Sequence, residues 1–367
     1  MTPTEIPTPN ESAQSREERG VCVRLLADDL TGACDAGAAF VAAGQRVRVW
    51  LGEKALYAAA ETVQAFNTAS RELAADDAAA AVGRAAAAIE MAPGTIFFKK
   101  VDSAGRGPIG AEICAAQKAL GARAVLLAPG FPDAGRTVRG GVLEVQDAAG
   151  QHSRVTLSEL FPAAMRDGMA AIARADEICA AVEGGKTLLV CDSATQEELD
   201  ALARAAGPME GLLYAGSAGL ARAIARVHAR ETKPMALPAA ARTLVIAGTP
   251  HAVTRLQLGE LESAGHLSGC ARILRIACEE DDPARIRDVF SGFDPEALIL
   301  TGGDTALFAG QALGAQSIRL QGEFAAGIPW GIVEGGEADG RVVVTKSGGF
   351  GSATALVDLI ARVSGAA

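Results

Sequence analysis

Short apolar runs alternate with alanine-rich stretches along almost the whole chain. The stretches 31–43, 73–90 and 108–120 predict helices between these runs. Near-continuous apolar strands that alternate with helices are typical of parallel sheets covered on both faces. We therefore predict an α/β fold, in which ligands bind at the carboxyl ends of the strands. The runs that predict strands, most of which end in a polar residue or a glycine, are 21–27, 47–51, 95–100, 124–130, 187–193, 211–217, 243–248, 297–303 and 341–349.

One segment interrupts this alternation. Residues 231–242 lie in a charged stretch that contains two prolines and has no periodic apolar pattern, which is typical of a linker. The chain of 367 residues is also longer than the usual single domain. We predict two domains, 21–230 and 243–367, each a largely parallel sheet covered by helices, with a cleft between them. The polar residues 1–20 predict a disordered tail, and the glycine-rich segment 131–158 predicts a long loop with short strands beside the site.

Charge and composition exclude several classes of protein. The net charge is −10 and no basic stripe is present, so we expect no nucleic-acid partner, although local cations can still bind a small anion. No apolar stretch approaches the roughly 20 residues of a membrane span, and the first residues lack the apolar core of a signal peptide. The seven cysteines and four histidines are scattered without zinc-site spacing. We expect a cytoplasmic protein with reduced cysteines, and homo-oligomerisation stays open.

The first candidate site follows the first predicted strand. Asp28 and Asp29 end that strand, and Thr31 and Gly32 open a helix that contains Asp35. Two adjacent carboxylates at a strand end can bind hydroxyls, take a proton or hold a metal ion. One of them could instead only cap the helix, since aspartate is common at that position. The pair, together with the third carboxylate one helical turn further on, favours a binding or catalytic role.

The second candidate site follows the strand 95–100. Lys100 and Arg106 can neutralise a carboxylate or a phosphate, and arginine offers a bidentate fork. Asp102 and Ser103 can hydrogen-bond sugar hydroxyls, and two glycines in the same loop let the backbone approach a ligand closely. Taken singly, each cation would more often be a solvated surface charge. Their grouping at one strand end favours an anion site.

A third stretch, residues 127–141, places Arg136 among glycines. This segment could close over an anion as a loop. It could equally be a turn-rich crossover, and its spacing leaves both alternatives open.

Three glycine turns follow predicted strands in the second domain. Each leads into a helix, whose free backbone N–H groups and positive dipole end suit a polyphosphate. None matches the P-loop pattern, and none is a dinucleotide-binding GxGxxG turn, which argues against an oxidoreductase. A single turn of this kind is often an ordinary tight turn, but three in one domain favour a nucleotide pocket. The candidate residues are Thr249, His251, Gly302, Gly303, Asp304, Thr305 and Gly348.

Seven stretches together resemble the four-carbon acid sugar kinase family. They are, in order, ADDLTGACDAG, KKVDSAGRGPIGAE, APGFPDAGRT, GSAGLA, AGTPHAVTRLQ, TGGDTA and KSGGFG. The resemblance covers about residues 23–360. It implies a sugar-acid-binding domain followed by an ATP-binding domain, which face each other across a cleft. Members phosphorylate tetronic acids such as threonate, erythronate or their 3-oxo forms, usually on the terminal hydroxyl.

The resemblance also implies roles for individual residues. Ala104, Gly105 and Pro108 depart from the family pattern, and its usual His-Asp-Pro stretch is not evident in 142–165. These departures border the expected substrate pocket, so they bear on the identity of the acid more than on the reaction. The substrate-side residues would be Asp28, Asp29, Lys100, Asp102, Ser103 and Arg106, with Arg136 beside them. The nucleotide-side residues would be Thr249, His251, Gly302, Gly303, Asp304, Thr305 and Gly348.

The resulting hypothesis is an ATP- and Mg²⁺-dependent kinase for a short sugar acid. Lys100 and Arg106 would anchor the carboxylate or the transferring phosphoryl group, and Asp29 or Asp102 would orient and deprotonate the hydroxyl. Two alternatives stay open. One is a sensor or effector that binds a sugar acid or a nucleotide on the same fold without catalysis. The other is a kinase for a related branched oxo acid such as 3-oxo-isoapionate.

Overall fold

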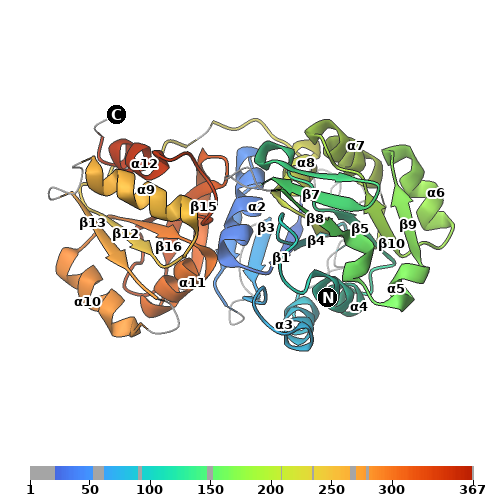
Figure 1. Ribbon diagram of the computed structural model, residues 1–367, viewed down its shortest axis with the longest axis horizontal. Coiled ribbons are helices and arrows are strands. Elements are labelled where there is room, and N and C mark those ends of the chain that lie inside the picture. The colour runs from blue at the N-terminus through green and yellow to red at the C-terminus, as the bar shows by residue number, and fades with distance from the viewer. Residues whose placement is uncertain are drawn as a thin grey trace, which may run out of the picture.

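The computed structural model describes residues 21–365, except for 53–61, 90–92, 147–151, 208, 234, 265–269 and 278–280. The predicted tail, residues 1–20, lies outside the described residues. The described strands form a 14-stranded sheet and a separate three-stranded sheet. Helices cover the large sheet on both faces (Figure 1), which confirms the predicted α/β class. None of the described helices is long and apolar enough to cross a membrane.

The amino-terminal lobe (residues 21–230) contributes a parallel run of strands in the order β2-β3-β1-β4-β11-β5-β10-β9. The central strands are apolar throughout because helices bury both of their faces. These strands are β1 Val23–Ala27, β2 Val47–Trp50, β3 Val63–Asn67, β4 Ile96–Lys100, β5 Ala124–Ala128, β9 Met169–Ile172, β10 Leu188–Cys191 and β11 Leu212–Gly216. The helices are α2 Leu30–Ala42, α3 Ala75–Ala87, α4 Ile109–Leu120, α5 Ala163–Asp167, α6 Ile178–Glu183, α7 Gln196–Ala206 and α8 Ala218–Val227.

The carboxy-terminal lobe (residues 243–365) continues the same sheet in the order β13-β12-β14-β17-β16-β15. Its first four strands are parallel, and β15 and β16 form an antiparallel hairpin that pairs with β17. The strands are β12 Thr243–Ala247, β13 Ala271–Arg275, β14 Ala297–Thr301, β15 Ser317–Ala325, β16 Ile328–Glu334 and β17 Val342–Lys346. The helices are α9 Ala252–Ser263, α10 Pro283–Phe293, α11 Gly303–Ala312 and α12 Ala355–Val363.

The two lobes share one continuous sheet. Strand β15 pairs antiparallel with β2, so that Ser317 lies opposite Trp50. Helix α2 stands at this junction (Figure 1), where it packs against β15 of the other lobe as well as against α8 of its own. Almost every residue of α2 is buried. The described residues of 231–242 form no helix or strand and lead from one lobe to the other.

The predicted strands and helices are confirmed within a few residues. The segment 131–158 contains the expected short strands, β6 Arg136–Arg139, β7 Val142–Gln146 and β8 His152–Thr156, which form the separate antiparallel sheet. The sequence did not predict β3, β9, β13 or the β15–β16 hairpin. Strand β15 alternates apolar and polar residues because one of its faces is partly exposed, so it lacks the continuous apolar run of a buried parallel strand.

Candidate functional site

A cleft of about 870 Å³ is lined by both lobes. Its walls are formed by residues that follow β1, β3 and β4 on one side and β12, β14 and β17 on the other. Asp28 lies behind this wall and is 1% exposed. The predicted residues that line the cleft are Asp29, Lys100, Asp102, Ser103, Arg106, Arg136, Thr249, His251, Gly302, Gly303, Asp304, Thr305 and Gly348.

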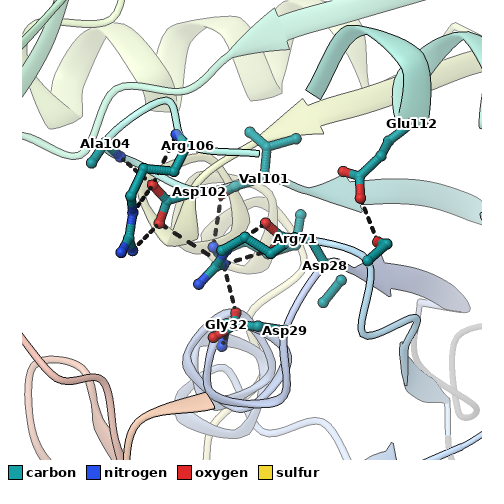
Figure 2. Close-up of polar contacts among 12 residues, drawn as sticks. Asp28, Asp29, Gly32, Arg71, Val101, Asp102, Ala104, Arg106 and Glu112 are labelled. Atoms are coloured by element: carbon teal, nitrogen blue, oxygen red, sulfur yellow. Dashed lines mark hydrogen bonds and ion pairs between the residues drawn. The ribbon is translucent and has the colours of Figure 1, made fainter. Parts of the chain in front are cut away.

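Arg71 connects the two acidic motifs, although the sequence analysis did not single it out. Its Nε donates to Asp28 Oδ2 (2.8 Å), and its Nη2 donates to Asp28 Oδ1 (2.9 Å) and to Asp29 Oδ1 (2.7 Å). The same nitrogen lies 3.9 Å from Asp102 Oδ1. Figure 2 shows the guanidinium between the three carboxylates. Burial raises the pKa of Asp28, but the positive charges of Arg71, Lys99 and Lys100 outweigh it and hold that pKa below its ordinary value.

Asp29 is the N-cap of α2 and also touches the other lobe. Its Oδ1 accepts from the backbone N–H of Gly32 (2.9 Å), and its Oδ2 accepts from the hydroxyl of Thr31 (2.6 Å). Gly303, at the amino end of α11, approaches so closely that a side chain there would collide with Asp29 Oδ2. The amino ends of two helices therefore meet at one carboxylate. Capping, which the sequence analysis weighed against function, is one role of Asp29, and its contact with Gly303 places it at the centre of the cleft.

Asp102 and Arg106 clamp each other in the loop after β4. Arg106 Nε and Nη2 donate to the two carboxylate oxygens of Asp102 at 2.9 and 2.8 Å. The backbone N–H groups of Ala104 and Arg106 also donate to Oδ2, at 3.2 Å each. Burial raises the pKa of Asp102, but Arg106, Arg71 and Lys100 lower it by more than that. The resulting pKa lies well below its ordinary value. Asp102 is thus a fixed anion that shapes its own loop.

Two adjacent lysines at the end of β4 point to opposite faces of the sheet, as strand geometry requires. Lys99 is fully buried and forms an ion pair with Glu112 of α4 (3.0 Å). Glu112 also accepts a hydrogen bond from the Ser70 hydroxyl, which fixes the loop that carries Arg71. Lys100 lines the cleft, and its Nζ donates to the carbonyl of Val101 (2.8 Å). Within the described residues no carboxylate lies within 4.0 Å of Lys100, so its charge is available to a ligand.

The glycine turns form the opposite wall of the cleft. Gly302 has φ +97°, a conformation that strongly favours glycine, and a side chain there would lie 2.9 Å from Thr249. A side chain on Gly348 would lie 2.8 Å from the hydroxyl of the same threonine. His251 caps α9, because its Nδ1 accepts from the backbone N–H of Val253 (3.2 Å). Backbone, not side chain, therefore forms most of this wall.

A buried lysine supports the last glycine turn from below. Lys346 ends β17, and its Nζ donates to the carbonyls of Ser347 (3.0 Å) and Phe350 (3.2 Å), and to the hydroxyl of Thr254 (3.3 Å). Burial lowers the pKa of Lys346 to about 8. Its donors thereby hold the carbonyl groups of this turn in place. Lys346 is absent from the cleft lining, so it positions the turn without reaching a ligand.

Aromatic and charged side chains bridge the lobes at one end of the cleft. The rings of Phe131 and Phe350 are 6.1 Å apart between centroids, and the guanidinium of Arg136 lies 5.6 Å from the centre of the Phe350 ring. Nearby, Arg222 of α8 forms an ion pair with Glu323 of β15 (3.4 Å). Arg136 is thus at the boundary between the two walls.

The end of one strand, β3, illustrates what the sequence analysis missed. Arg71 follows β3, a run of five buried residues that ends in Asn67. The rule that ligands bind at strand ends would have found Arg71, but β3 is short and contains Gln64, so it was not recognised as a strand. Ser70 was missed for the same reason.

The described residues offer little for a metal ion by themselves. Among them no group of three or more His, Cys, Asp or Glu side chains could hold a metal ion. Asp304, at the amino end of α11, is the carboxylate on the glycine side of the cleft. Burial raises its pKa, and the negative charges of Asp29 and Glu72 raise it further. One such carboxylate suits Mg²⁺ that arrives with phosphates, because Mg²⁺ commonly uses one or two carboxylates plus substrate oxygens.

Two family models match the chain. A sugar-binding N-terminal domain matches residues 23–167, and a nucleotide-binding C-terminal domain matches residues 283–356. The first contains the Arg71 and Asp102 clusters, and the second contains the last two glycine turns. The two matches thus fall on opposite walls of the cleft.

Several curated proteins are similar over most of the chain. D-threonate kinase of Bordetella bronchiseptica is 31% identical, and the alignment covers 92% of this chain and 96% of that protein. D-threonate kinase of Salmonella typhimurium is 28% identical, and the alignment covers 92% of this chain and 97% of that protein. D-erythronate kinase of Heliobacterium modesticaldum is 29% identical over 66% of this chain and 60% of that protein.

Solved structures are similar as well. The crystal structure of a domain of unknown function from Bordetella bronchiseptica, a domain-swapped dimer with bound citrate, is 30% identical. It covers 94% of this chain and 98% of its own, with a TM-score of 0.50. A Haemophilus influenzae protein is 20% identical, with a TM-score of 0.64 and coverage of 93% and 99%, and shows that the fold is shared.

Proposed function

This chain belongs to the four-carbon acid sugar kinase family, and from that premise we propose that it transfers the γ-phosphoryl group of ATP to the terminal hydroxyl of a tetronate or 3-oxo-tetronate. The observation that carries the proposal is the opposition of two unlike walls in one cleft. Cations and carboxylates after β1, β3 and β4 face glycine turns after β12, β14 and β17. A kinase needs both an acceptor site and a phosphate site within one cleft.

The acid would bind on the charged wall. Lys100 has no carboxylate partner within 4.0 Å among the described residues, and Arg106 uses Nε and Nη2 for Asp102, which leaves Nη1 for a ligand. These two cations can pair with a carboxylate of the acid. The positive charge of Arg71 is already offset by Asp28 and Asp29, so its role would be to hold those carboxylates rather than to bind the anion. Asp29 and Asp102 would accept hydrogen bonds from the hydroxyls of the acid, and Ser103 could accept from or donate to them.

ATP would bind on the glycine wall. The amino end of α11 and residues 347–350 line the cleft, and a polyphosphate at the amino end of a helix gains from its free N–H groups and from the helix dipole. Gly302, Gly303 and Gly348 allow the phosphates to approach because they carry no side chain. Asp304 would hold Mg²⁺, which supplies charge neutralisation on the phosphates when it is bound. Contacts across the lobes, such as that of Phe131 with Phe350, help to exclude water from the cleft.

The test is an ADP-release assay of the purified chain with ATP, Mg²⁺ and a panel of acids. The panel contains D-threonate, D-erythronate, their 3-oxo forms, and branched oxo acids that include 3-oxo-isoapionate. We expect acid-dependent ADP release on at least one tetronate, with little ATP hydrolysis when the acid is omitted. Mass spectrometry of the product would identify the hydroxyl that is phosphorylated.

Two controls separate the alternatives. Omitting Mg²⁺ should abolish turnover, and calorimetry should detect binding of each substrate on its own. Binding of an acid without turnover of ATP on any member of the panel would contradict the kinase and favour a sensor. Turnover confined to a branched oxo acid would keep the reaction and change the substrate.

A further inference from the structure

Asp35 is a buried carboxyl group on the cleft whose Oδ1 has no partner in the part of the chain that the structure describes. It lies in the second turn of α2, is 6% exposed and lines the cleft together with Thr31 and Gly32 of the same helix. Residues three and four apart share one face of a helix, which explains why this face reaches the ligand space. Oδ1 of Asp35 is buried and accepts no hydrogen bond from any of the described residues. Buried polar atoms are almost always paired, so an unpaired one in a cleft points to a ligand.

The neighbouring carboxylates differ from Asp35 in this respect. Both oxygens of Asp28 accept from Arg71, and both oxygens of Asp102 accept from Arg106. Asp29 accepts from Arg71, from a backbone N–H and from a hydroxyl. Donors already occupy oxygens of these three carboxylates and would have to be released before a substrate hydroxyl could replace them. Asp35 needs no such release.

The charges around Asp35 come from several elements. Lys100 of β4 and Arg222 of α8 favour its ionised form, whereas Glu323 of β15 and Asp29 at the start of α2 oppose it. Burial is the largest influence, and together these effects raise the pKa of Asp35 to about 6. An acid–base group works best when its pKa lies near the operating pH. Asp35 is therefore ionised at neutral pH and still basic enough to accept a proton.

We propose that Asp35 is the catalytic base, which accepts the proton of the substrate hydroxyl as that oxygen attacks the γ-phosphorus. This proposal rests on the proposed function. The new bond joins the hydroxyl oxygen to phosphorus, and the bond from phosphorus to the bridging oxygen of ADP breaks. The hydroxyl proton passes to a carboxylate oxygen of Asp35 and then to solvent after the products leave. No further reactant is required.

The position of Asp35 fits this step. Asp35 lies one turn along α2 from Gly32, and a side chain at Gly32 would lie 3.2 Å from Lys100 Nζ. The same end of α2 meets Gly303 of α11 through Asp29. The base, the cation of the acid site and the amino end of the phosphate-binding helix thus converge on one part of the cleft. A hydroxyl between them can reach both the base and the phosphate.

A purely structural role for Asp35 is disfavoured because its ionised carboxylate lowers the stability of the folded protein. A raised carboxyl pKa means that ionisation destabilises the folded state as the pH rises from about 4 to 6. An amide or an apolar residue would avoid that cost. The carboxylate is therefore expected to be needed for the reaction.

The test compares Asp35→Asn, Asp35→Glu and, as a matched control, Asp176→Asn on the exposed surface. For Asp35→Asn we expect kcat to fall by about 10²- to 10⁴-fold, with KM for ATP and for the acid within a few-fold of wild type. The melting temperature at pH 7 should be equal to or higher than that of wild type. Asp35→Glu should recover part of kcat, and Asp176→Asn should match wild type in all respects.

The pH profile provides a readout that a structural role would not change. Wild-type kcat should fall below about pH 6, as Asp35 takes up a proton, and Asp35→Asn should lack this limb. Three results for Asp35→Asn would each overturn the inference. They are an unchanged kcat, a rise in KM for the acid as the only effect, and a lower melting temperature together with loss of binding of both substrates. Failure of wild type to turn over any acid would instead refute the proposed function, so the two failures are distinguishable.

Discussion

The two walls of the cleft are built by different means. On the charged wall formed after β1, β3 and β4, called the acid wall below, side chains hold each other. Arg71 holds Asp28, and Arg106 holds Asp102. On the glycine wall, the backbone forms most of the surface, and a charged group beneath it, Lys346, binds carbonyl oxygens. The acid wall therefore offers a ligand charges that are costly to bury, whereas the glycine wall offers a backbone surface that a ligand can approach closely.

This difference predicts how each wall responds to substitution. Removing one member of a buried ion pair leaves its partner unpaired, so stability and activity fall together on the acid wall. Adding a methyl group to a glycine turn blocks approach of the ligand, while most of the core stays intact. On the glycine wall, binding should fall much more than stability.

Arg71→Met should have the largest effect. Asp28 is 1% exposed and would lose both of its donors, so the free energy of unfolding should drop by about 3–5 kcal/mol. Asp29 and Asp102 would lose their shared neighbour, and kcat/KM for the acid should fall by about 10³-fold or more, as expected when a charged positioning group is lost. Urea unfolding and steady-state kinetics measure the two effects.

Arg71→Lys sharpens this prediction. A lysine keeps the charge but cannot reproduce the bidentate contact with Asp28, so it should restore part of the stability and less of the activity. If Arg71→Met lost activity while its urea midpoint stayed at the wild-type value, the acid wall would not be held together by paired charges.

Gly303→Ala should have the next largest effect, now on the glycine wall. A side chain at Gly303 would collide with Asp29 Oδ2, and it would also fill space at the amino end of α11. We expect KM for ATP to rise by about 10- to 100-fold, because displacement of a phosphate-binding backbone by less than 1 Å costs that much. The free energy of unfolding should fall by only about 1–3 kcal/mol.

Gly259→Ala is the matched control. Gly259 lies in α9, and a side chain there would meet nothing within 4 Å. Alanine in a helix is more stable than glycine by about 0.5–1 kcal/mol, so this variant should melt at a slightly higher temperature with unchanged kinetics. Equal kinetic effects of the two glycine substitutions would argue against Gly303 as a site of close approach.

Lys346→Met should have a smaller effect on catalysis and a distinctive pH dependence. Without Nζ the carbonyls of Ser347 and Phe350 lose their donor, and KM for ATP should rise by roughly tenfold, about the value of one charged hydrogen bond. Burial lowers the pKa of Lys346 to about 8 in the folded protein, so the folded protein releases this proton at a lower pH than the unfolded chain does. The cost of burying the charge is present in full below about pH 8. Wild type should therefore gain stability between about pH 8 and 10 relative to Lys346→Met, as thermal melts at each pH would show. A difference in stability between wild type and Lys346→Met that stays constant between about pH 8 and 10 would contradict the lowered pKa of Lys346.

The sequence predicted the walls better than their internal organisation. The rule that ligands bind at strand ends identified Asp29, Lys100 and Gly302 because each lies at the carboxyl end of a strand with a buried apolar run. Alternation fixes only that Lys99 and Lys100 point apart, and the structure shows that Lys100 lines the cleft while Lys99 is buried. The partner of Asp28 was equally hidden, because Arg71 lies 43 positions away along the chain. Pairing of this kind depends on tertiary contacts that a strand pattern does not contain.

The junction of the lobes shows the same limit. Two separate sheets were a reasonable reading of two sets of apolar runs divided by a linker. The lobes are joined by the pairing of β2 with β15. Strand β2 is mostly buried and β15 is partly exposed, and neither sequence pattern reveals which strand lies beside it. The continuous sheet was therefore visible only in the structure.

Phe350→Leu should have the smallest effect, and it tests whether the two walls act together. The ring of Phe350 contacts Phe131 and the guanidinium of Arg136, both of the other lobe, yet it lies in the glycine turn that Lys346 supports. An aromatic pair contributes about 0.5–1.5 kcal/mol beyond its buried area, which corresponds to a factor of roughly 2–13 in binding. We expect this loss to appear as weaker coupling, so that saturating acid improves ATP binding less than it does in wild type. Calorimetric titration of ATP with and without acid measures that coupling. If Phe350→Leu weakened ATP binding equally in both titrations, the ring would belong to the glycine wall alone and the two walls would bind their ligands independently.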